Sequence, residues 1–460
     1  MPAIELKQEV GMYNDPTMDG LIRLVMEADS EKSPLPEESI QAALRCMMDY
    51  FAVTLAGSVE PEAKALENYA GSQEGSASLI GRRVKTSVEM AAFVNGSTGH
   101  LLEFDDVKKN LGHGTVVIAP AVLALGESLG KSGREILAAF VVGFEVAARL
   151  ANAVEPAHSQ AGWHTTSTCG VFGAAAACGK ILKLAGDAMA GVFGMAASFS
   201  SGLRKNMGTP VKYLHTGHAA QNGLKAAILG SRGFYGSREV FSGKQSFGGT
   251  FSSPLACEKI TEGLGERFEV CANGFKFYPC CASAHSAIDA ALSMRGKARF
   301  RTEDIEEIKV GTVPIVLDNM KYHVPKNITE ARFSIPFCIS LALVDGRVTL
   351  DNFSSKRLKS TQMKELMKKI AIQLDPEMKS LGYRGTENSR VTIITKDKRM
   401  ITERVDAARG HPLNPASQEE LRDKFLQCSK RTLAEEKAMR VLAILENFQG
   451  LPNVQNLFCP

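Results

Sequence analysis

Residues 169–202 are crowded with alanine, glycine and serine, and only scattered larger apolar side chains lie between them. Small side chains let the backbones of packed helices approach one another closely. A membrane span is the alternative interpretation of this stretch, but Lys180, Lys183 and Asp187 interrupt it. The stretch therefore predicts the packed centre of an α-helical domain.

Helical patterning extends well beyond this stretch, from about residue 16 to residue 265. Residues 34–58 place apolar side chains at helical spacing and end at Gly57, which we expect to cap the helix.

The apolar segment 133–154 has a helix start at its amino end, because Ser132 followed by Glu135 matches a capping box. The same segment carries Glu145 and Arg149 in its interior. We therefore interpret it as a buried helix of a soluble protein, and we expect no membrane partner.

The pattern changes after the helical region. Residues 285–300 predict a helix, and residues 305–313 predict a strand with alternating character. Residues 391–405 contain two β-prone runs around a polar turn, which predicts a hairpin. These elements indicate a smaller α+β domain at 268–405.

The length of 460 residues exceeds what one typical hydrophobic core supports and so favours two domains. Residues 416–448 return to helical periodicity and are expected to pack on the first domain. The predicted fold is mainly α, with a large all-α domain at 1–267, completed by C-terminal helices at 406–460, and the smaller α+β domain at 268–405.

Charge and composition exclude other classes of protein. Lys and Arg number 54 against 50 for Asp and Glu, a formal net charge of +4, and only 7% of residues are aromatic. A nucleic-acid-binding domain shows a concentrated basic surplus, so we expect no nucleic-acid partner. The amino terminus, MPAIELKQEV, has acidic residues where a signal peptide has a basic head and an apolar run, which predicts a cytoplasmic protein.

Residues 101–117 combine three carboxylates, two lysines and His113 between two glycines. A histidine between glycines predicts an exposed, tight turn on which the imidazole can meet a ligand. The carboxylates of Glu103, Asp105 and Asp106 fit a helix terminus or a structural salt-bridge cluster equally well.

Two further segments place cationic side chains at predicted helix starts. His164 precedes a run of hydroxyl residues, and Lys212, His215 and His218 precede an alanine-rich helix. Helix amino ends attract anions, and a nearby lysine adds a full charge. His215 and His218 have the spacing of a metal-ligand pair, but zinc needs more ligands than these, so we expect no metal.

Residues 274–285 contain Lys276, the adjacent Cys280 and Cys281, and His285. A nucleophilic thiolate activated by Lys276 or His285 is one interpretation. The chain has neither a P-loop nor a strand-anchored GxGxxG, which argues against a nucleotide cofactor. Taken together, the chemistry-bearing segments predict a cationic pocket for a small polyanionic molecule, with histidine and lysine as acid–base groups.

These segments resemble the MmgE/PrpD family over nearly the whole chain. Residues 76–106 are similar to the family's stretch ending in AxxNG…HxxDFDD. PVKYLHTGHAAQNG around Lys212 resembles its K-x-x-x-x-G-x-A-A-x-x-G element, and FKFYPCCASAHSAID its K-x-Y-P-x-C-x-x-x-H pattern. RGHPLNPASQEELRDKF at 409–425 resembles its late G-H-P…K-F element.

The resemblance implies a homodimer of two-domain subunits, with the active site in the cleft between domains and with neither a metal nor an organic cofactor. By motif position it implies that His113 is the catalytic histidine and that His164, Lys212 and Lys276 are pocket residues. We predict catalytic roles for His113, Lys212 and Lys276.

Three positions differ from decarboxylase-like members of the family. Glu103 stands where these members carry Asp, Val107 where they carry Thr, and Cys281 where one decarboxylase branch has a further His. We predict that these three residues and His164 bind the substrate. Because valine lacks the threonine hydroxyl, Val107 cannot make the hydrogen bond to substrate that the threonine allows, which argues against cis-aconitate itself.

The loop that follows also departs from the family pattern. The usual His-Pro is His113-Gly114 in this chain, and Lys108 and Lys109 replace apolar or neutral residues. These changes leave the predicted fold intact and the substrate open.

The chemistry that the family shares is a carbanion or enolate next to a carboxylate. We predict that Lys212 and Lys276 bind and polarise substrate carboxylates while His113 moves the proton. The predicted function is a cofactor-independent lyase, a dehydratase or decarboxylase, acting on a small di- or tricarboxylate. The alternatives are an isomerase that epimerises an amino- or iminodicarboxylate and, least favoured, a catalytically inactive binding protein.

Overall fold

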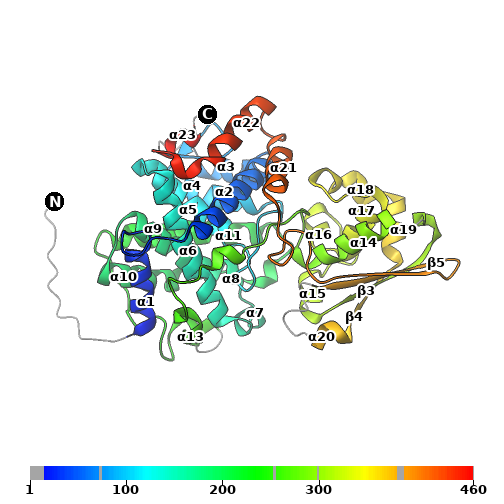
Figure 1. Ribbon diagram of the computed structural model, residues 1–460, viewed down its shortest axis with the longest axis horizontal. Coiled ribbons are helices and arrows are strands. Elements are labelled where there is room, and N and C mark those ends of the chain that lie inside the picture. The colour runs from blue at the N-terminus through cyan, green and yellow to red at the C-terminus, as the bar shows by residue number, and fades with distance from the viewer. Residues whose placement is uncertain (1–14, 72–74, 252–254, 298–299, 381–387, 459–460) are drawn as a thin grey trace.

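The computed structural model describes residues 15–71, 75–251, 255–297, 300–380 and 388–458. A large helical body occupies one side of the molecule, and a smaller body containing a β-sheet occupies the other (Figure 1). The mainly α architecture with a smaller α+β part is therefore as predicted. The amino-terminal segment that led us to expect a cytoplasmic protein lies outside the described residues.

The larger body is built from helices that the small side chains allow to pack closely. Its helices are α1 (Pro16–Glu27), α2 (Glu37–Gly57), α3 (Pro61–Ala70), α4 (Val88–His100), α5 (Thr115–Leu129), α6 (Gly133–Val154), α7 (Ala157–Gln160), α8 (Thr165–Thr168), α9 (Gly170–Ile181), α10 (Gly186–Phe199), α11 (Val211–Gly230), α12 (Phe247–Phe251) and α13 (Cys257–Thr261). A short antiparallel pair, β1 (Ala77–Ser78) and β2 (Lys85–Thr86), lies between α3 and α4 in the chain.

Helix α9 lies at the centre of this body, in contact with α5, α6, α10 and α11. A Cβ atom on Gly143 of α6 would lie 2.4 Å from the carbonyl oxygen of Gly173 in α9. One on Gly223 of α11 would lie 2.6 Å from the carbonyl oxygen of Val171. Real Cβ contacts are not this short, so glycine is required at these crossings, and the predicted packed centre is confirmed.

Helix α2 corrects one detail of the prediction. Gly57 is its last helical residue, and Ser58 takes the C-cap position with right-handed backbone. A Cβ atom at Gly57 would lie 2.5 Å from the carbonyl oxygen of Thr98 in α4. The glycine is therefore there because two helices approach closely, and it does not cap the helix.

Helix α6 begins with the predicted capping box between Ser132 and Glu135. It is long and apolar enough to cross a membrane by length and composition, but 94% of its most apolar window is buried inside the protein. Glu145 and Arg149 form an ion pair within it, and Arg149 also donates to the carbonyl oxygens of Ile260 and Gly263. This is a core helix, as expected.

The smaller body holds a four-stranded sheet in the order β4-β3-β5-β6. Its strands are β3 (Ile305–Thr312), β4 (Ile370–Leu374), β5 (Ser389–Thr395) and β6 (Met400–Val405). β3 pairs with β4 in parallel and with β5 antiparallel. β5 and β6 form the predicted hairpin, with Thr392 opposite Thr402.

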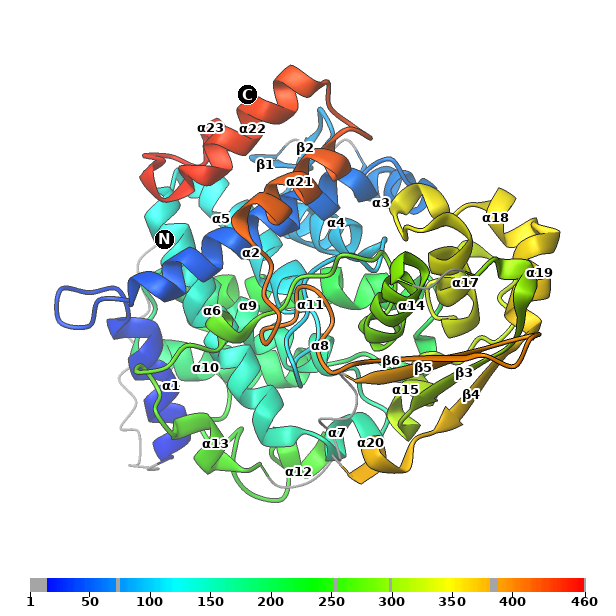
Figure 2. The same ribbon diagram turned by 45° about the vertical axis from the view of Figure 1, so that its right-hand side comes forward.

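Helices α14 (His285–Lys297), α17 (Ile335–Asp345) and α19 (Thr361–Lys368) lie over one face of this sheet (Figure 2). The shorter helices are α15 (Pro314–Asn319), α16 (Ile328–Ala331), α18 (Ser355–Lys359) and α20 (Pro376–Ser380). The predicted helix at 285–300 is therefore confirmed as far as Lys297, and residues 298–299 lie outside the described residues.

Two large hydrophobic cores lie within the described residues. The first is formed by the helices of the larger body and also contains Phe425 of α21 (Gln418–Ser429) and Leu442 of α22 (Glu435–Glu446). The second contains Ile308, Phe337 and Val391 of the smaller body. The C-terminal helices, including α23 (Gln455–Phe458), thus pack on the first core. The exact domain boundaries drawn from the sequence stay a prediction.

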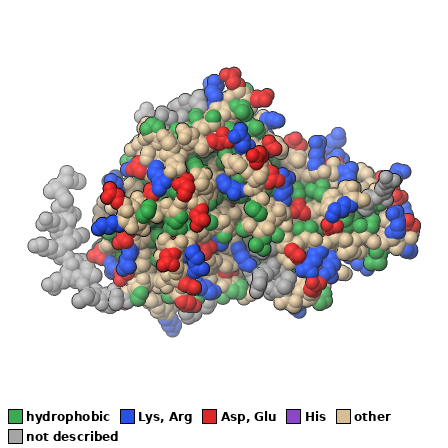
Figure 3. All heavy atoms as spheres, in the orientation of Figure 1, with side chains coloured by type: hydrophobic (Ala, Val, Ile, Leu, Met, Phe, Trp, Pro, Cys, Tyr) green, Lys and Arg blue, Asp and Glu red, His purple; other side chains and the backbone are tan. Residues whose placement is uncertain are grey.

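One face of the molecule shows the mixed charge that the near-neutral composition indicates. On the face shown in Figure 3, Lys and Arg side chains lie among Asp and Glu side chains across both bodies.

Candidate active site

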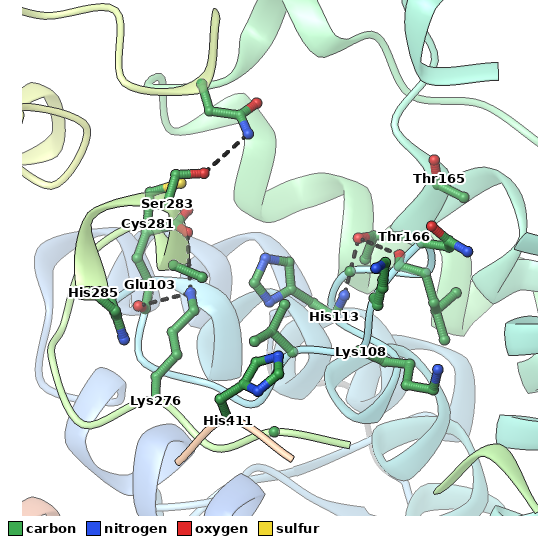
Figure 4. Close-up of a pocket in the computed structure, with 18 of the residues that line it drawn as sticks. Glu103, Lys108, His113, Thr165, Thr166, Lys276, Cys281, Ser283, His285 and His411 are labelled. Carbon is green, nitrogen blue, oxygen red and sulfur yellow. Dashed lines mark hydrogen bonds and ion pairs between the residues drawn. The ribbon is translucent and has the colours of Figure 1, made fainter. Parts of the chain in front are cut away.

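A cavity of about 280 Å³ is lined by residues from both bodies. Its walls come from the loop after α4, the start of α8, the start of α11, the segment before α14, and the loop that precedes α21. All seven residues predicted from the sequence line it, namely Glu103, Val107, His113, His164, Lys212, Lys276 and Cys281. Figure 4 shows Glu103, Lys276 and Cys281 on one side of this pocket and Lys108, Thr165 and Thr166 on the other.

The loop after α4 is fixed by backbone contacts at both ends. The amide of Val107 donates to the carbonyl oxygen of Gly274 at 2.9 Å, and the amide of Gly274 donates back to Val107 at 3.0 Å. A tight turn closes between Lys108 and Gly112, whose φ is +81°. A Cβ atom on Gly112 would lie 2.3 Å from Oγ1 of Thr166, so the turn needs glycine for both its conformation and its space.

Glu103 lies between the two predicted lysines. Nζ of Lys212 lies 2.6 Å from Oε1 of Glu103, and Nζ of Lys276 lies 3.7 Å from Oε2. Lys276 also donates to the backbone carbonyl of Glu103 at 3.0 Å. Glu103 has φ of +51°, a strained conformation that persists only where surrounding contacts fix it. All three side chains are buried.

Electrostatics in this group favour the ionised forms. Burial by itself would raise the pKa of Glu103, but Lys212, His100 and Lys276 outweigh it and lower the pKa to about 2. Burial would lower the pKa of Lys276, but Glu103 and Asp105 outweigh it and raise the pKa above its usual value. Glu103 is thus the carboxylate within ion-pair distance of both ammonium groups, and the ionised Asp105 adds a second negative charge near Lys276.

His113 is buried, with about 9% of its surface exposed, so the expected exposed turn is wrong on this point. The loop is folded inward because the His113 amide donates to Thr166 Oγ1 at 3.1 Å. Its Nδ1 lies 3.0 Å from the carbonyl oxygen of Asp106 and 2.9 Å from Oδ2 of Asp105. Burial lowers the pKa of His113 to about 4, although Asp105 opposes the shift, so the imidazole is a neutral base at pH 7.

His164 stands at the N-cap position of α8, as the hydroxyl run predicted. Its Nδ1 lies 3.0 Å from Nδ1 of His215. Burial and the nearby Lys212 hold the pKa of His164 well below its usual range. Lys212 and His215 lie inside α11, in its first turns, rather than ahead of the helix as expected.

His215 and His218 have the sequence spacing of a metal-ligand pair, but in the structure they contact different partners. His215 contacts His164, whereas His218 contacts the hydroxyl of Ser201 at 3.2 Å and the amide of Asn222 at 3.0 Å.

Lys108 does not add an unpaired positive charge to the pocket, and Cys281 is not an activated thiolate. Lys108 is ion-paired with Glu269 at 2.7 Å, so its charge is already matched. Burial raises the pKa of the Cys281 thiol even though Lys276 opposes it, which is the opposite of what an activated thiolate needs. The nucleophilic-cysteine interpretation is therefore disfavoured.

Arg204, in the short 3₁₀ helix Arg204–Asn206, also lines the cavity. It donates to the carbonyl oxygen of Ser159 and to Oδ1 of Asn319, both at 2.9 Å. Within the described part of the chain, its guanidinium has no carboxylate within ion-pair distance. Asn319 in turn donates to the hydroxyl of Ser283 at 3.2 Å, so the contact joins the two bodies.

Comparison with known families decides the identity of the fold. The MmgE/PrpD N-terminal domain model matches residues 26–258, and the MmgE/PrpD C-terminal domain model matches residues 278–449. The chain belongs to the MmgE/PrpD family.

Relatives in this family carry lyase names. The chain is 30% identical to human cis-aconitate decarboxylase over 375 residues, which are 78% of this chain and 76% of the relative. It is 29% identical to the mouse cis-aconitate decarboxylase over 376 residues, with the same coverage of each chain. A cis-aconitate decarboxylase-like protein of Aspergillus oryzae is 27% identical over 440 residues, 89% of this chain and 90% of the relative. These names support the lyase prediction and do not favour the isomerase or the inactive protein.

Two residues that organise the site were not singled out from the sequence. His100, the last residue of α4, accepts a hydrogen bond at Nε2 from Lys212 at 2.8 Å, and its Nδ1 lies 2.9 Å from Oδ1 of Asp105. The signal was present, because His100 is the histidine of the family's HxxDFDD pattern. Arg204 had no motif to mark it, and only the fold brings it to the cavity.

A second group of buried charges supports the loop from behind. Nζ of Lys424 in α21 lies 2.6 Å from Oδ1 of Asp49 and donates to the carbonyl oxygen of Phe104 at 2.7 Å. Asp106 accepts hydrogen bonds from Thr115 and, at 2.6 Å, from Asn273. Burial and the nearby Asp49 raise the pKa of Asp106 to about 8, so this carboxyl is protonated at pH 7. The late K-F element of the family therefore anchors the loop that carries Glu103.

The ligand atoms of His100, Asp105 and His113 lie within 4.8 Å of one another, a grouping that could hold a metal ion. In this structure the same atoms face one another as hydrogen-bond or ion-pair partners, and the Lys212 ammonium occupies the remaining nitrogen of His100. A cation there would also face Lys212 and Lys276. The donor set therefore fits a metal poorly.

Proposed function

We propose that this protein is a cofactor-independent lyase that dehydrates or decarboxylates a small di- or tricarboxylate. One observation carries the proposal: Lys212 and Lys276 share the single carboxylate of Glu103 in the wall of a cavity that His113 also lines. The two ammonium groups suit a substrate carboxylate, and the neutral imidazole suits proton transfer next to it.

The chemistry follows from the charges. A carbanion next to a carboxylate is stabilised when nearby cations take up the developing negative charge. We assign that role to Lys212 and Lys276, and we assign proton transfer to His113. In dehydration, the neutral imidazole of His113 removes the α-proton, and the β-hydroxyl leaves as water with a proton returned by the imidazolium. In decarboxylation, CO₂ leaves and the carbanion takes up a proton from the imidazolium form of His113, which regains its proton from water. Acid–base positioning of this kind is worth roughly 10²–10⁴-fold in rate.

The remaining lining residues set which substrate fits. Glu103 orients the two lysines, and His164 contacts the substrate from the start of α8. Val107 and Cys281 present an apolar methyl pair and a thiol, so we expect fewer hydrogen bonds to the substrate on this side than in relatives with Thr and His. Arg204, on the part of the wall shared by both bodies, is suited to a second carboxylate.

A turnover screen tests the proposal. Purified protein is incubated with small di- and tricarboxylates, including 2-methylcitrate and cis-aconitate, and products are followed by proton NMR in deuterated water. We expect water or CO₂ loss from at least one compound, with Lys276→Met and His113→Gln reduced at least a hundredfold. Exchange of the α-proton with neither loss would instead support epimerisation.

Two further measurements test the rest of the proposal. Exhaustive chelation is expected to leave turnover unchanged, and loss of activity that zinc restores would overturn the cofactor-free mechanism. Light scattering of the purified protein is expected to give the mass of the homodimer that the family resemblance implies.

A further inference from the structure

A chain of buried side chains runs behind the cavity wall and joins Lys212 to His113. Lys212 contacts Nε2 of His100 at 2.8 Å, and Nδ1 of His100 contacts Oδ1 of Asp105 at 2.9 Å. The other carboxylate oxygen lies 2.9 Å from Nδ1 of His113. Lys212 and His113 line the cavity, whereas His100 and Asp105 are not among its lining residues in the described part of the chain. The two middle residues can therefore act only through the residues that they hold.

In this series of contacts, the groups at the two ends decide which atom of each hydrogen bond is the donor and which is the acceptor. The Lys212 ammonium has no lone pair, so it donates and Nε2 of His100 accepts. A neutral imidazole that accepts at Nε2 carries its hydrogen on Nδ1, which then donates to Asp105. At the other end, the carbonyl of Asp106 can only accept, so Nδ1 of His113 also carries a hydrogen.

We propose that His100 and Asp105 are positioning residues that hold His113 in the tautomer whose Nε2 lone pair is available to the substrate. Asp105 faces the Nδ1–H group of both imidazoles, one with each carboxylate oxygen. Its negative charge also stabilises the imidazolium that forms when His113 takes a proton. His100 carries no proton to the substrate; it sets the spacing and donor direction between Lys212 and Asp105.

This inference rests on the proposed function for its activity measurements. Its spectroscopic measurement needs no substrate, so failure of the proposed function and failure of the network give different results.

Asp105→Asn tests the shared carboxylate. An amide offers one acceptor atom and carries no charge, so it cannot accept from Nδ1–H of His100 and also place a negatively charged oxygen beside Nδ1–H of His113. We expect kcat to fall by about 10²–10⁴-fold with little change in KM, because the substrate does not touch this residue. A variant with the kcat of the parent protein would overturn the assignment.

His100→Gln and His100→Leu form a matched pair. The glutamine carbonyl can accept from Lys212 and its amide can donate to Asp105, which reproduces both contacts without a titratable ring. We expect the glutamine variant to keep most of the parent kcat and the leucine variant to lose roughly 10–100-fold, the effect of losing a hydrogen bond to a charged group. Equal losses in the two variants would show that the two hydrogen bonds kept by glutamine are not what His100 contributes, and would overturn the positioning role.

Nitrogen NMR of the histidine rings gives the substrate-independent test. The full-length protein is labelled with ¹⁵N, and the ring signals of His100 and His113 are assigned by their disappearance in His100→Gln and His113→Gln. At pH 7 we expect both rings as the Nδ1–H tautomer. An Nε2–H tautomer for either ring would overturn the proposal, whatever the turnover screen shows.

Discussion

Nζ of Lys212 lies 2.6 Å from Oε1 of Glu103, and neither side chain is more than 3% exposed. A buried ion pair is strongly sensitive to the loss of one partner, because the other charge is then left uncompensated in a medium of low dielectric constant. Loss of Glu103 would affect two buried charges, because Lys276 also contacts this residue. Several properties of the protein can be predicted from this arrangement and its neighbours.

Glu103→Gln removes the shared carboxylate and leaves two buried ammonium groups without it. We expect the free energy of unfolding to fall by about 3–5 kcal/mol, as for other broken buried pairs. A small dicarboxylate such as succinate is expected to raise the melting temperature more in this variant than in the parent, because it supplies the missing charge. Glu103→Asp is the control, and equal stabilisation of all three proteins by succinate would contradict the prediction.

The pH dependence of kcat/KM is expected to reflect the lowered pKa of His113. Burial places that pKa at about 4, so the unprotonated base is present throughout pH 5–8 and is lost only as the pH falls through about 4. We therefore expect a flat profile from pH 8 to pH 5 after correction for substrate ionisation. A fall in kcat/KM centred near pH 6.5 would show that His113 is not the base or is not buried in the active form.

Asp106→Asn tests the protonated carboxyl beneath the loop. In the folded protein its pKa is about 8, above its unfolded value of about 3.8, so the folded state binds the extra proton between these pH values. Stability therefore falls as the pH rises through this window in the parent but not in the variant. Urea unfolding at pH 6, 7 and 8 is expected to show the variant gaining relative stability with pH, and a constant difference would refute the assignment.

Arg204→Gln tests the proposed second carboxylate site. The amide keeps polar contact with neighbouring groups but loses the charge and the forked donors. We expect KM for the dicarboxylate identified in the screen to rise roughly 10–100-fold with kcat little changed. An analogue in which the remote carboxylate is an amide should show no such difference between variant and parent. A similar rise for both compounds would place Arg204 outside the substrate site.

Lys424→Met tests how the C-terminal helix supports the active site. The substitution leaves Asp49 buried without its ion-pair partner and removes the donor to Phe104. We expect a loss of about 3–5 kcal/mol in unfolding free energy. The double variant Lys424→Met with Asp49→Asn should recover part of this loss, because the uncompensated charge is gone. No recovery would mean that the contact with Phe104 carries the whole effect.

Much of the fold followed from local pattern. The capping box at Ser132 and the hairpin around residues 396–399 depend on neighbours in the sequence, so periodicity and turn chemistry predicted them. Gly57 was misread because its role is a contact with Thr98 in another helix, about forty residues away in the chain. Such contacts leave no mark in a local pattern.

The candidate site divides in the same way. The sequence by itself determined the residue types, the motifs and therefore the family, and with them seven of the residues that line the cavity. Only the tertiary structure decided that His113 is buried and neutral, that one carboxylate serves two lysines, and that His100 and Arg204 belong with them. The physical reason is that charge state and tautomer are set by burial and by partners a few ångströms away, and those partners come from segments that only folding brings together.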